Sequence, residues 1–470
     1  MKKNIVYNIA FVIILVISAL MYGTLMFNNN VWYDEAYSLA MIKHSFSEIA
    51  RITAEDVHPP LYYFGLKLFT SIGGDVITLS KIFSIIPILL TMLVGYFQLG
   101  KIVDKKTGFV FVAIMALLPL YQPFAVEIRM YTWASFSVFS CGIFAYRAIS
   151  EEKKRYFAIY ALFGVISAYL HYFAFVSVLI IYFIAFVAAT KKKLFVPWLI
   201  TALLSLAAYL PWLSSFVMQL GEKVTNDYWI APITLDTIKH YADVWLQCGE
   251  YTKFYIIAFL VVLIISILGV LVDCNKVRKC ALLFGVSVFV FTCMIGIGAS
   301  VLVRPVFIER YAIPAIPLVL AGIAAGISVI KSKWFLILLA IVGIAGYGAS
   351  YPYIYNLEYE SSEKNIEYIL ENGEYDSLIC FVDSHLYGVL SYYEPQKPIY
   401  RPALSKGSPF ENIYALSQRD VENEERTLIF VPKGETAPVE VCEGYFTEYY
   451  CEVVTYGIAS DVYLCTKTSL

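Results

Sequence analysis

Runs of about twenty apolar residues without charge recur along the sequence, and they limit the possible folds more than any other feature. The first run extends from Ile5 to Leu25, and similar runs recur up to about Tyr351. A helix needs about twenty apolar residues to cross a bilayer core of roughly 30 Å. With 59% hydrophobic and 15% charged residues, the chain is also more apolar than a soluble domain requires. We therefore predict an all-α polytopic membrane protein with about eleven transmembrane helices.

Lysine and arginine gather between alternate pairs of the predicted spans. The six clusters are Lys2 with Lys3, Lys101 with Lys105 and Lys106, Arg147 to Arg155, Lys191 to Lys193, Lys276 to Lys279, and Lys331 with Lys333. The positive-inside rule places these short connections in the cytoplasm. The N-terminus is then cytoplasmic, and everything after Tyr351 is extracytoplasmic. No small-residue cleavage site follows the first apolar run, which favours an uncleaved span over a signal peptide.

Two domains are expected. Residues 1–351 would form the transmembrane domain, including a first extracytoplasmic loop, 27–75, with interfacial helices. Residues 352–470 would form a small soluble α/β domain, because β-rich runs such as TLIFVPK alternate with helix-like stretches. The helix-like stretches are SSEKNIEYILENG, 361–373, and the segment near ENIYALSQRD, 411–420.

The nine cysteines show no CxxC or zinc spacing. Four of them share the tail, namely Cys380, Cys442, Cys451 and Cys465, and whether they pair stays open at this point. The net charge of −2 and the lack of a basic stripe with interleaved aromatic residues exclude nucleic acid as an expected partner.

Two acidic segments follow the first span. The stretch VWYDEAY carries Asp34 and Glu35, which in the simplest interpretation only begin a helix, since Asp caps helices and Glu suits their first turn. The stretch EDVHPPLYYFGLKLF contains Asp56, His58 and Lys67, and its two prolines predict the start of an interfacial helix. A single histidine such as His58 is more often a surface residue than a ligand or an acid.

Arginines stand at two other outward connections. The segments are EIRMYTW and VRPVFIERYAIP, which supply Glu127, Arg129, Tyr131, Glu309, Arg310 and Tyr311. An arginine at a span boundary is often only an anchor for the membrane interface. The positive-inside bias disfavours it on this side, however, and its guanidinium group matches phosphate oxygens. The tight turn SAYLHYFAF adds His171 at similar depth, where an interfacial histidine in an aromatic belt is the simpler interpretation.

Together these segments resemble the C-superfamily (GT-C) membrane glycosyltransferases. The acidic pair, HPPLYYF, the RMY turn, the HYF turn and ERYAIP occur in the order seen in the branch of protein O-mannosyltransferases and lipid A aminoarabinose transferase, glycosyltransferase family 39. The resemblance covers the first 330 or so residues. It implies a transferase that moves a hexose or pentose, with inversion, from a polyprenyl phosphate donor to an acceptor hydroxyl on the extracytoplasmic face.

The resemblance also implies roles for the candidate residues. Asp34 would be the general base, and Glu35 would orient the acceptor or hold a basic partner. Arg129 and Arg310 would bind the donor phosphate, with Lys67 as a weaker candidate. The expected substrate-binding residues are Asp56, His58, Glu127, Tyr131, His171, Glu309 and Tyr311.

Metal dependence, the acceptor and the cell membrane involved are less defined. The outward loops contain no DxD motif and members of the superfamily differ in metal use, so no cofactor is assigned and a divalent metal stays possible. The acceptor would be a protein, a polymer or a glycolipid. The resemblance and the short cytoplasmic loops favour a bacterial plasma membrane, although the basic clusters would also fit an endoplasmic reticulum enzyme.

Two other classes of protein compete with the transferase. A transporter would carry charges near mid-membrane and show paired halves, whereas here the charges gather at span ends. A non-catalytic scaffold or export component of cell-envelope glycan assembly would not depend on Asp34. Within the enzyme class, an O-antigen ligase-like transferase that uses another lipid-linked donor remains an alternative.

Overall fold

The computed structural model describes most of the chain. It covers residues 2–27, 31–222, 230–246, 248–273 and 275–359 and, in the remainder, residues 370, 374–382, 386–402, 404, 408–416, 425–432, 449–456 and 460–467. These residues form two compact units, one of Met1–Phe27 with Val57–Ile354 and one of Asn28–Asp56 with Tyr355–Leu470. We call them the bundle unit and the tail unit.

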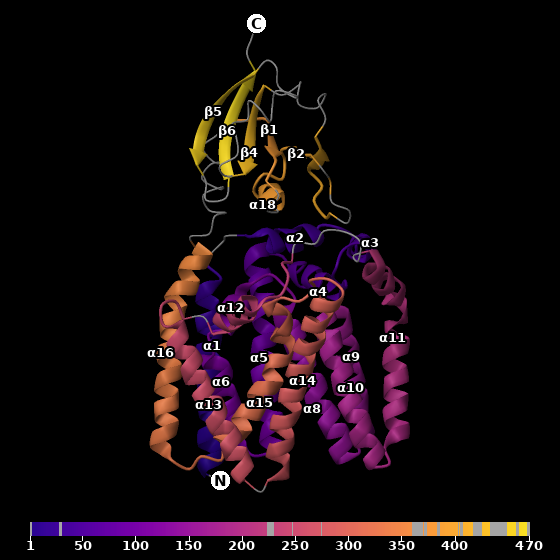
Figure 1. The fold of residues 1–470 in the computed structure, drawn as a ribbon, viewed down its shortest axis with the longest axis vertical. Helices are drawn as coiled ribbons and strands as arrows, with labels where there is room; N and C mark the ends of the chain where they lie inside the picture. The colour runs from indigo at the N-terminus through magenta and orange to yellow at the C-terminus, as the bar shows by residue number, and fades with distance from the viewer. Residues whose placement is uncertain are drawn as a thin grey trace. The chain divides into compact units, whose positions relative to one another are not determined.

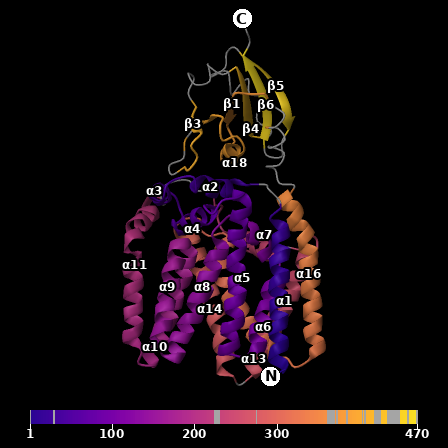
Figure 2. The ribbon, with the colours of Figure 1, turned by 180° about the vertical axis from the view of Figure 1, so that it is seen from behind.

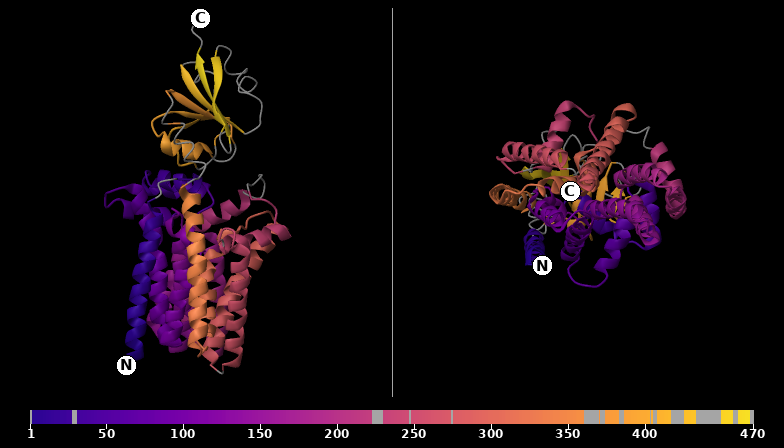
Figure 3. Two further views of the ribbon diagram at one scale, coloured as in Figure 1. Left: turned by 90° about the vertical axis from the view of Figure 1, so that its left-hand side faces the viewer. Right: turned by 90° about the horizontal axis from the view of Figure 1, so that it is seen from below.

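The long helices of the bundle unit run side by side (Figures 1 and 2), and the view from below in Figure 3 shows them end-on. Its long helices are α1 (Lys2–Leu25), α5 (Val76–Ile102), α8 (Tyr131–Glu151), α9 (Lys154–Leu170), α10 (Tyr172–Lys191), α11 (Phe195–Glu222), α13 (Thr252–Val272), α14 (Lys276–Leu302) and α16 (Lys333–Tyr359). Its shorter elements are α4 (Leu61–Thr70), α6 (Lys105–Leu117), α7 (Tyr121–Val126), α12 (Leu235–Trp245), the 3₁₀ helix η1 (Glu309–Ala315) and α15 (Ile316–Ile327).

Eight helical segments among the described residues are long and apolar enough to cross a membrane: α1, α5, α10, α11, α13, α14, α16 and the continuous segment Glu309–Ile327. The three other predicted spans coincide with α6, α8 and α9. Of these, α8 packs against α5, α9 and α10 and buries the serines at 135, 137 and 140, so its lower hydropathy reflects polar groups that face protein rather than lipid. The predicted polytopic helical fold is confirmed.

Helix starts in the bundle unit follow local signals. Pro60 is the N-cap of α4, as the double proline predicts. The side chain of Asp75 accepts a hydrogen bond of 2.8 Å from the Thr78 amide at the start of α5. Asp104 does the same for the Thr107 amide at the start of α6. Such caps satisfy backbone donors that the first helical turn leaves without partners.

The tail unit contains a six-stranded mixed sheet with strand order β3-β2-β1-β4-β6-β5. Its strands are β1 (Ser377–Cys380), β2 (Ile399–Arg401), β3 (Ile413–Ala415), β4 (Arg426–Pro432), β5 (Tyr449–Tyr456) and β6 (Ser460–Lys467). The first four strands pair in parallel, and the pairs β4–β6 and β5–β6 are antiparallel. With α18 (Leu386–Tyr393) between β1 and β2, this confirms the predicted small α/β domain.

The helix expected near 411–420 is wrong where the structure describes it. Residues 413–415 form strand β3, which pairs with β2. The Asn412 side-chain amide donates hydrogen bonds of 2.8 and 2.9 Å to the carbonyls of Glu394 and Lys397. These tertiary bonds favour an extended chain over the local helical pattern. Of the helix expected over 361–373, only Leu370 is among the described residues.

The segment 27–75, which the sequence predicts as the first extracytoplasmic loop, is divided between the two units. Residues 28–56, with α2 (Tyr33–Met41) and α3 (Phe46–Glu55), belong to the tail unit. The rest of the loop, with α4, belongs to the bundle unit. Our expected domains kept 27–75 whole within residues 1–351, and the difference arises because α2 packs against α18. Cys465 in β6 is disulfide-bonded, whereas Cys380 is free, and Cys442 lies outside the described residues.

Candidate functional site

Arg129 is the centre of a buried polar group in the bundle unit. It lies between α7 and α8 and is only 4% exposed. Its Nη1 donates a hydrogen bond of 3.3 Å to the Tyr63 hydroxyl, and its Nη2 donates one of 3.4 Å to Nε2 of His58. The HPPLYYF segment holds both partners, since His58 precedes the proline corner and Tyr63 lies in the first turn of α4. The HPPLYYF segment and the RMY turn are therefore in direct contact.

Aromatic rings connect this group to the other predicted residues. The ring of His171 lies 5.8 Å from that of His58, 5.7 Å from that of Tyr131 and 4.9 Å from that of Tyr311, measured between centroids. The guanidinium carbon of Arg310 is 5.9 Å from the centroid of the Tyr131 ring. Four segments far apart in the chain thus bring two arginines and two histidines together. We call His58, Arg129, His171 and Arg310 the basic cluster.

His171 joins α9 to α10, beyond the ends of both helices. Its Nδ1 accepts a hydrogen bond of 3.2 Å from the Phe173 amide and so caps α10. Burial, with His58, Arg129 and Arg310 nearby, holds the pKa of His171 well below its ordinary value. The ring is therefore neutral, with its proton on Nε2. It contributes a hydrogen-bond donor rather than a charge, and the positive charge of the cluster comes from the arginines.

The acidic pair lies in the tail unit, in the first turn of α2. The Trp32 amide donates a hydrogen bond of 3.4 Å to the Glu35 carboxylate, which is buried. Glu35 thus caps the helix, as the simplest interpretation of the sequence expects. Asp34 is half-buried, and its backbone carbonyl accepts a hydrogen bond of 2.9 Å from the Ser38 hydroxyl.

Asp56 lies close to the acidic pair within the tail unit. Its carboxylate accepts a hydrogen bond of 3.1 Å from the Tyr37 hydroxyl. Burial raises the pKa of Tyr33 well above its ordinary value, with further contributions from Tyr387, Asp56 and Asp34. Tyr37 lies in α2, as Asp34 does, so the hydrogen bond attaches Asp56 to the helix that carries the acidic pair. The structure brings these two predicted residues together.

The other predicted residues have more limited roles. Glu127 and Glu309 are half-buried, and their backbone carbonyls accept hydrogen bonds from the Arg129 amide at 2.8 Å and the Trp245 indole at 3.0 Å. Both residues thereby shape the turns that carry the arginines. Lys67 lies one helical turn beyond Tyr63, on the same face of α4. Because Lys67 lies on this face, it remains a candidate for binding the donor phosphate.

The sequence reasoning missed two residues. The sequence predicts only an interfacial helix at Tyr63, whose hydroxyl accepts a hydrogen bond from Arg129. Lys81 is fully buried near the start of α5, where the sequence predicts only a span. The signal was present, because an ionisable residue inside a transmembrane segment is rarely there without a function. Among the residues that the structure describes, no group of three or more His, Cys, Asp or Glu side chains could hold a metal ion.

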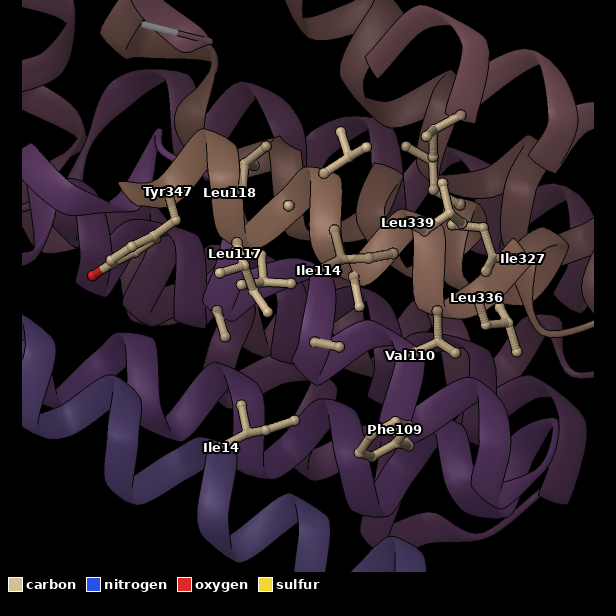
Figure 4. A pocket seen from close by; sticks show the side chains of 18 of the residues that line it. Ile14, Phe109, Val110, Ile114, Leu117, Leu118, Ile327, Leu336, Leu339 and Tyr347 are labelled. Atoms are coloured by element: carbon tan, nitrogen blue, oxygen red, sulfur yellow. The ribbon is translucent and has the colours of Figure 1, made fainter. Parts of the chain in front are cut away.

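The bundle unit also contains an apolar cavity of about 610 Å³, shown in Figure 4. It is lined by α1, α6, α13, α15 and α16, with side chains such as Ile14, Phe109 and Leu339. Lys106 and Tyr347 are among its few polar lining residues. None of the basic cluster lines this cavity, which is therefore separate from the charged group.

Comparisons with known proteins agree with this architecture. Residues 57–214 match the family of dolichyl-phosphate-mannose-protein mannosyltransferases. No curated protein matches the sequence significantly. The fold is similar to that of ArnT from Cupriavidus metallidurans in the apo state, with a TM-score of 0.65 at 9% identity over 96% of this chain and 97% of ArnT.

Two further solved structures share the fold. ArnT bound to undecaprenyl phosphate gives a TM-score of 0.61 at 11% identity, over 96% of this chain and 97% of that one. The arabinofuranosyltransferase AftD from Mycobacteria gives 0.52 at 11% identity, over 97% of this chain and 40% of AftD. The fold of nearly the whole chain is thus similar to that of ArnT and AftD.

Proposed function

We propose that this chain, which has the fold of the C-superfamily membrane glycosyltransferases, transfers a sugar from a polyprenyl phosphate donor to an acceptor hydroxyl. The observation that carries the proposal is the basic cluster. Two arginines and two histidines from four separate segments are gathered in the bundle unit, in a fold that ArnT shares while binding undecaprenyl phosphate. A buried group of this kind suits an anionic ligand with a hydrocarbon chain in the membrane.

The donor phosphate would be bound by Arg129 and Arg310. A guanidinium group holds two phosphate oxygens in parallel hydrogen bonds. Tyr63 and His58 fix the Arg129 side chain before the sugar donor binds. The phosphate gains negative charge in the transition state, and this charge then meets hydrogen-bond donors that are already in place. The neutral His171 adds a donor without adding charge.

The reaction would be an inverting substitution at the anomeric carbon. The acceptor oxygen forms a bond to this carbon while the bond to the phosphate oxygen breaks, and the lipid phosphate leaves with the electron pair. Asp34 takes the hydroxyl proton as general base. The resemblance supplies this role, and the use of Glu35 as a helix cap supports Asp34 over its neighbour. Asp56, Tyr131, Glu127, Glu309 and Tyr311 remain proposed substrate-binding residues.

The chemistry would take place on the extracytoplasmic face of the plasma membrane. The basic connections give the bundle unit a cytoplasmic N-terminus and place the tail unit outside. The disulfide at Cys465 supports this, since disulfides persist in oxidising compartments. The sugar would be a hexose or pentose, and the acceptor a protein, a polymer or a glycolipid.

The decisive experiment follows labelled sugar from membrane lipid to acceptor in cells that make the wild type or Asp34→Asn at equal abundance. We expect the isosteric variant to lose about 10²–10⁴-fold in transfer rate, because it cannot accept the proton. Glu35→Gln is the matched control, since the amide oxygen can still cap α2. Equal transfer by wild type and Asp34→Asn would exclude Asp34 as the base, and no transfer by the wild type would overturn the proposed function.

A further inference from the structure

We infer that α18 and Phe410 of the tail unit are positioning elements that hold α2, and with it Asp34, in its working conformation. The inference rests on the proposed function, because it assigns a role to the surroundings of the proposed base. It gives the C-terminal domain a part in catalysis that does not require contact with substrate.

The contact between α2 and α18 is centred on Tyr33, the residue before Asp34. The hydroxyl groups of Tyr33 and Tyr387 lie 3.1 Å apart, and their rings meet edge to face at 5.6 Å between centroids. The ring of Phe410 lies 6.1 Å from that of Tyr33 and 6.3 Å from that of Tyr37. It also lies 6.1 Å from the ring of Tyr387, so four aromatic side chains form one cluster. Such ring pairs stabilise beyond their buried area.

Gly388 makes this close approach possible. A β-carbon at position 388 would lie 2.6 Å from Cδ2 of Tyr33 and 2.7 Å from Cζ of Phe410. No ordinary side chain fits at these distances, so α18 presents bare backbone to the Tyr33 ring. The position lies within a helix, where alanine is conformationally favourable. Gly388→Ala therefore changes the packing on α2 without straining α18.

Two further contacts hold the chain on either side of α2. Before the helix, the Val31 amide donates a hydrogen bond of 3.4 Å to the Tyr393 hydroxyl. After it, Nε2 of His44 lies 2.7 Å from the Pro409 carbonyl, and Nδ1 lies 3.8 Å from the Glu411 carboxylate. The segment is thus attached to the tail before, within and after the helix.

The length of α2 explains why these attachments matter. It has nine residues, and isolated helices of that length are marginal in water. Its conformation must therefore come from packing, and α18 and the residues around Phe410 pack against it within the tail unit. A general base acts only at a defined distance from its proton, and a small displacement lowers the rate steeply.

The test compares Gly388→Ala and Tyr387→Phe with the wild type in the full-length protein. Gly298→Ala is the matched control, since a β-carbon there meets nothing within 4 Å. Amide hydrogen exchange in α2 should become about tenfold faster in Gly388→Ala, because overpacking displaces the helix. Tyr387→Phe should have a smaller effect, since it removes one hydroxyl and keeps the ring.

Measurements of kcat and of probe binding distinguish a positioning role of α18 from general instability of the protein. In Gly388→Ala we expect kcat to fall on the order of 10²-fold. Binding of undecaprenyl phosphate as probe should stay unchanged, because the basic cluster lies in the bundle unit. Unchanged exchange and unchanged kcat in Gly388→Ala would overturn the inference, and so would equal losses of kcat and probe binding. The proposed function would still stand in both cases if Asp34→Asn were inactive, so the two failures are distinguishable.

Discussion

Individual residues of the basic cluster differ in what they contribute. Arg129 combines burial with two fixed hydrogen bonds, so it is preorganised for an anion. His171 contributes a neutral ring whose Nδ1 is already used as a helix cap. Glu35 caps α2 with its carboxylate, whereas its neighbour Asp34 is the proposed base. Residue type alone does not separate these roles, whereas hydrogen-bond partners do.

Replacing Arg129 by lysine tests the importance of the planar guanidinium group. Arg129→Lys keeps the charge but loses the two parallel donors, so we expect undecaprenyl phosphate to bind about 10–100-fold more weakly. The measurement is a binding titration with purified protein. Arg155→Lys, at an exposed position near the start of α9, is the control. Equal affinity of wild type and Arg129→Lys would show that this arginine does not hold the phosphate through two parallel hydrogen bonds of its guanidinium group.

The titration of His171 predicts a specific pH dependence of stability. Its pKa is lowered in the folded state, so the folded protein keeps the ring neutral while the unfolded chain takes up a proton below about pH 6.5. The contribution of the neutral His171 ring to the free energy of unfolding is therefore complete above about pH 6.5 and is lost as the pH falls below that value. His171→Asn can still accept a bond from the Phe173 amide but cannot titrate. Between pH 8 and pH 5, the Tm of the wild type should therefore fall further than the Tm of His171→Asn. Equal decreases in Tm would contradict a depressed pKa of His171.

Helix packing in the bundle depends on small residues at close crossings. The pair Gly269 and Gly326 lets α13 and α15 approach backbone to backbone, and a β-carbon at 269 would lie 2.8 Å from the Gly326 carbonyl. The Ser266 hydroxyl donates a hydrogen bond of 2.9 Å to the Ile323 carbonyl across the same interface. Without a strong hydrophobic force between helices in lipid, such crossings are a main source of association.

Gly326→Ala should therefore loosen the α13–α15 crossing. A methyl group there would overlap the backbone of Ser266, and we expect a loss of about 1–3 kcal/mol. The apparent Tm of detergent-solubilised protein should fall. For Gly298→Ala, which has open space, the Tm should be unchanged. Equal Tm values for both variants would mean that the crossing is not tightly packed.

For the whole molecule, the orientation in the membrane determines which substrates the site meets. Native Cys280 is exposed near the start of α14. It follows Lys276, Arg278 and Lys279, which we propose to be cytoplasmic. Tyr414 of the tail unit is 47% exposed. In intact cells, a membrane-impermeant maleimide should label Tyr414→Cys in a Cys280→Ser background. Native Cys280 should react only after permeabilisation, and the opposite pattern would invert the proposed topology.

The sequence by itself determined the polytopic helical class, the α/β tail and the start of α4, because span length and a signal such as the double proline depend on neighbouring residues. It also indicated all four residues of the basic cluster as candidates. Only the tertiary structure decided which groups meet. Tyr63 and Arg129 lie 66 positions apart, and Tyr33 and Tyr387 lie 354 apart. Periodicity carries no information about such pairs, since side-chain packing between distant segments depends on how the helices cross. For the same reason the sequence did not indicate that α2 is part of the tail unit.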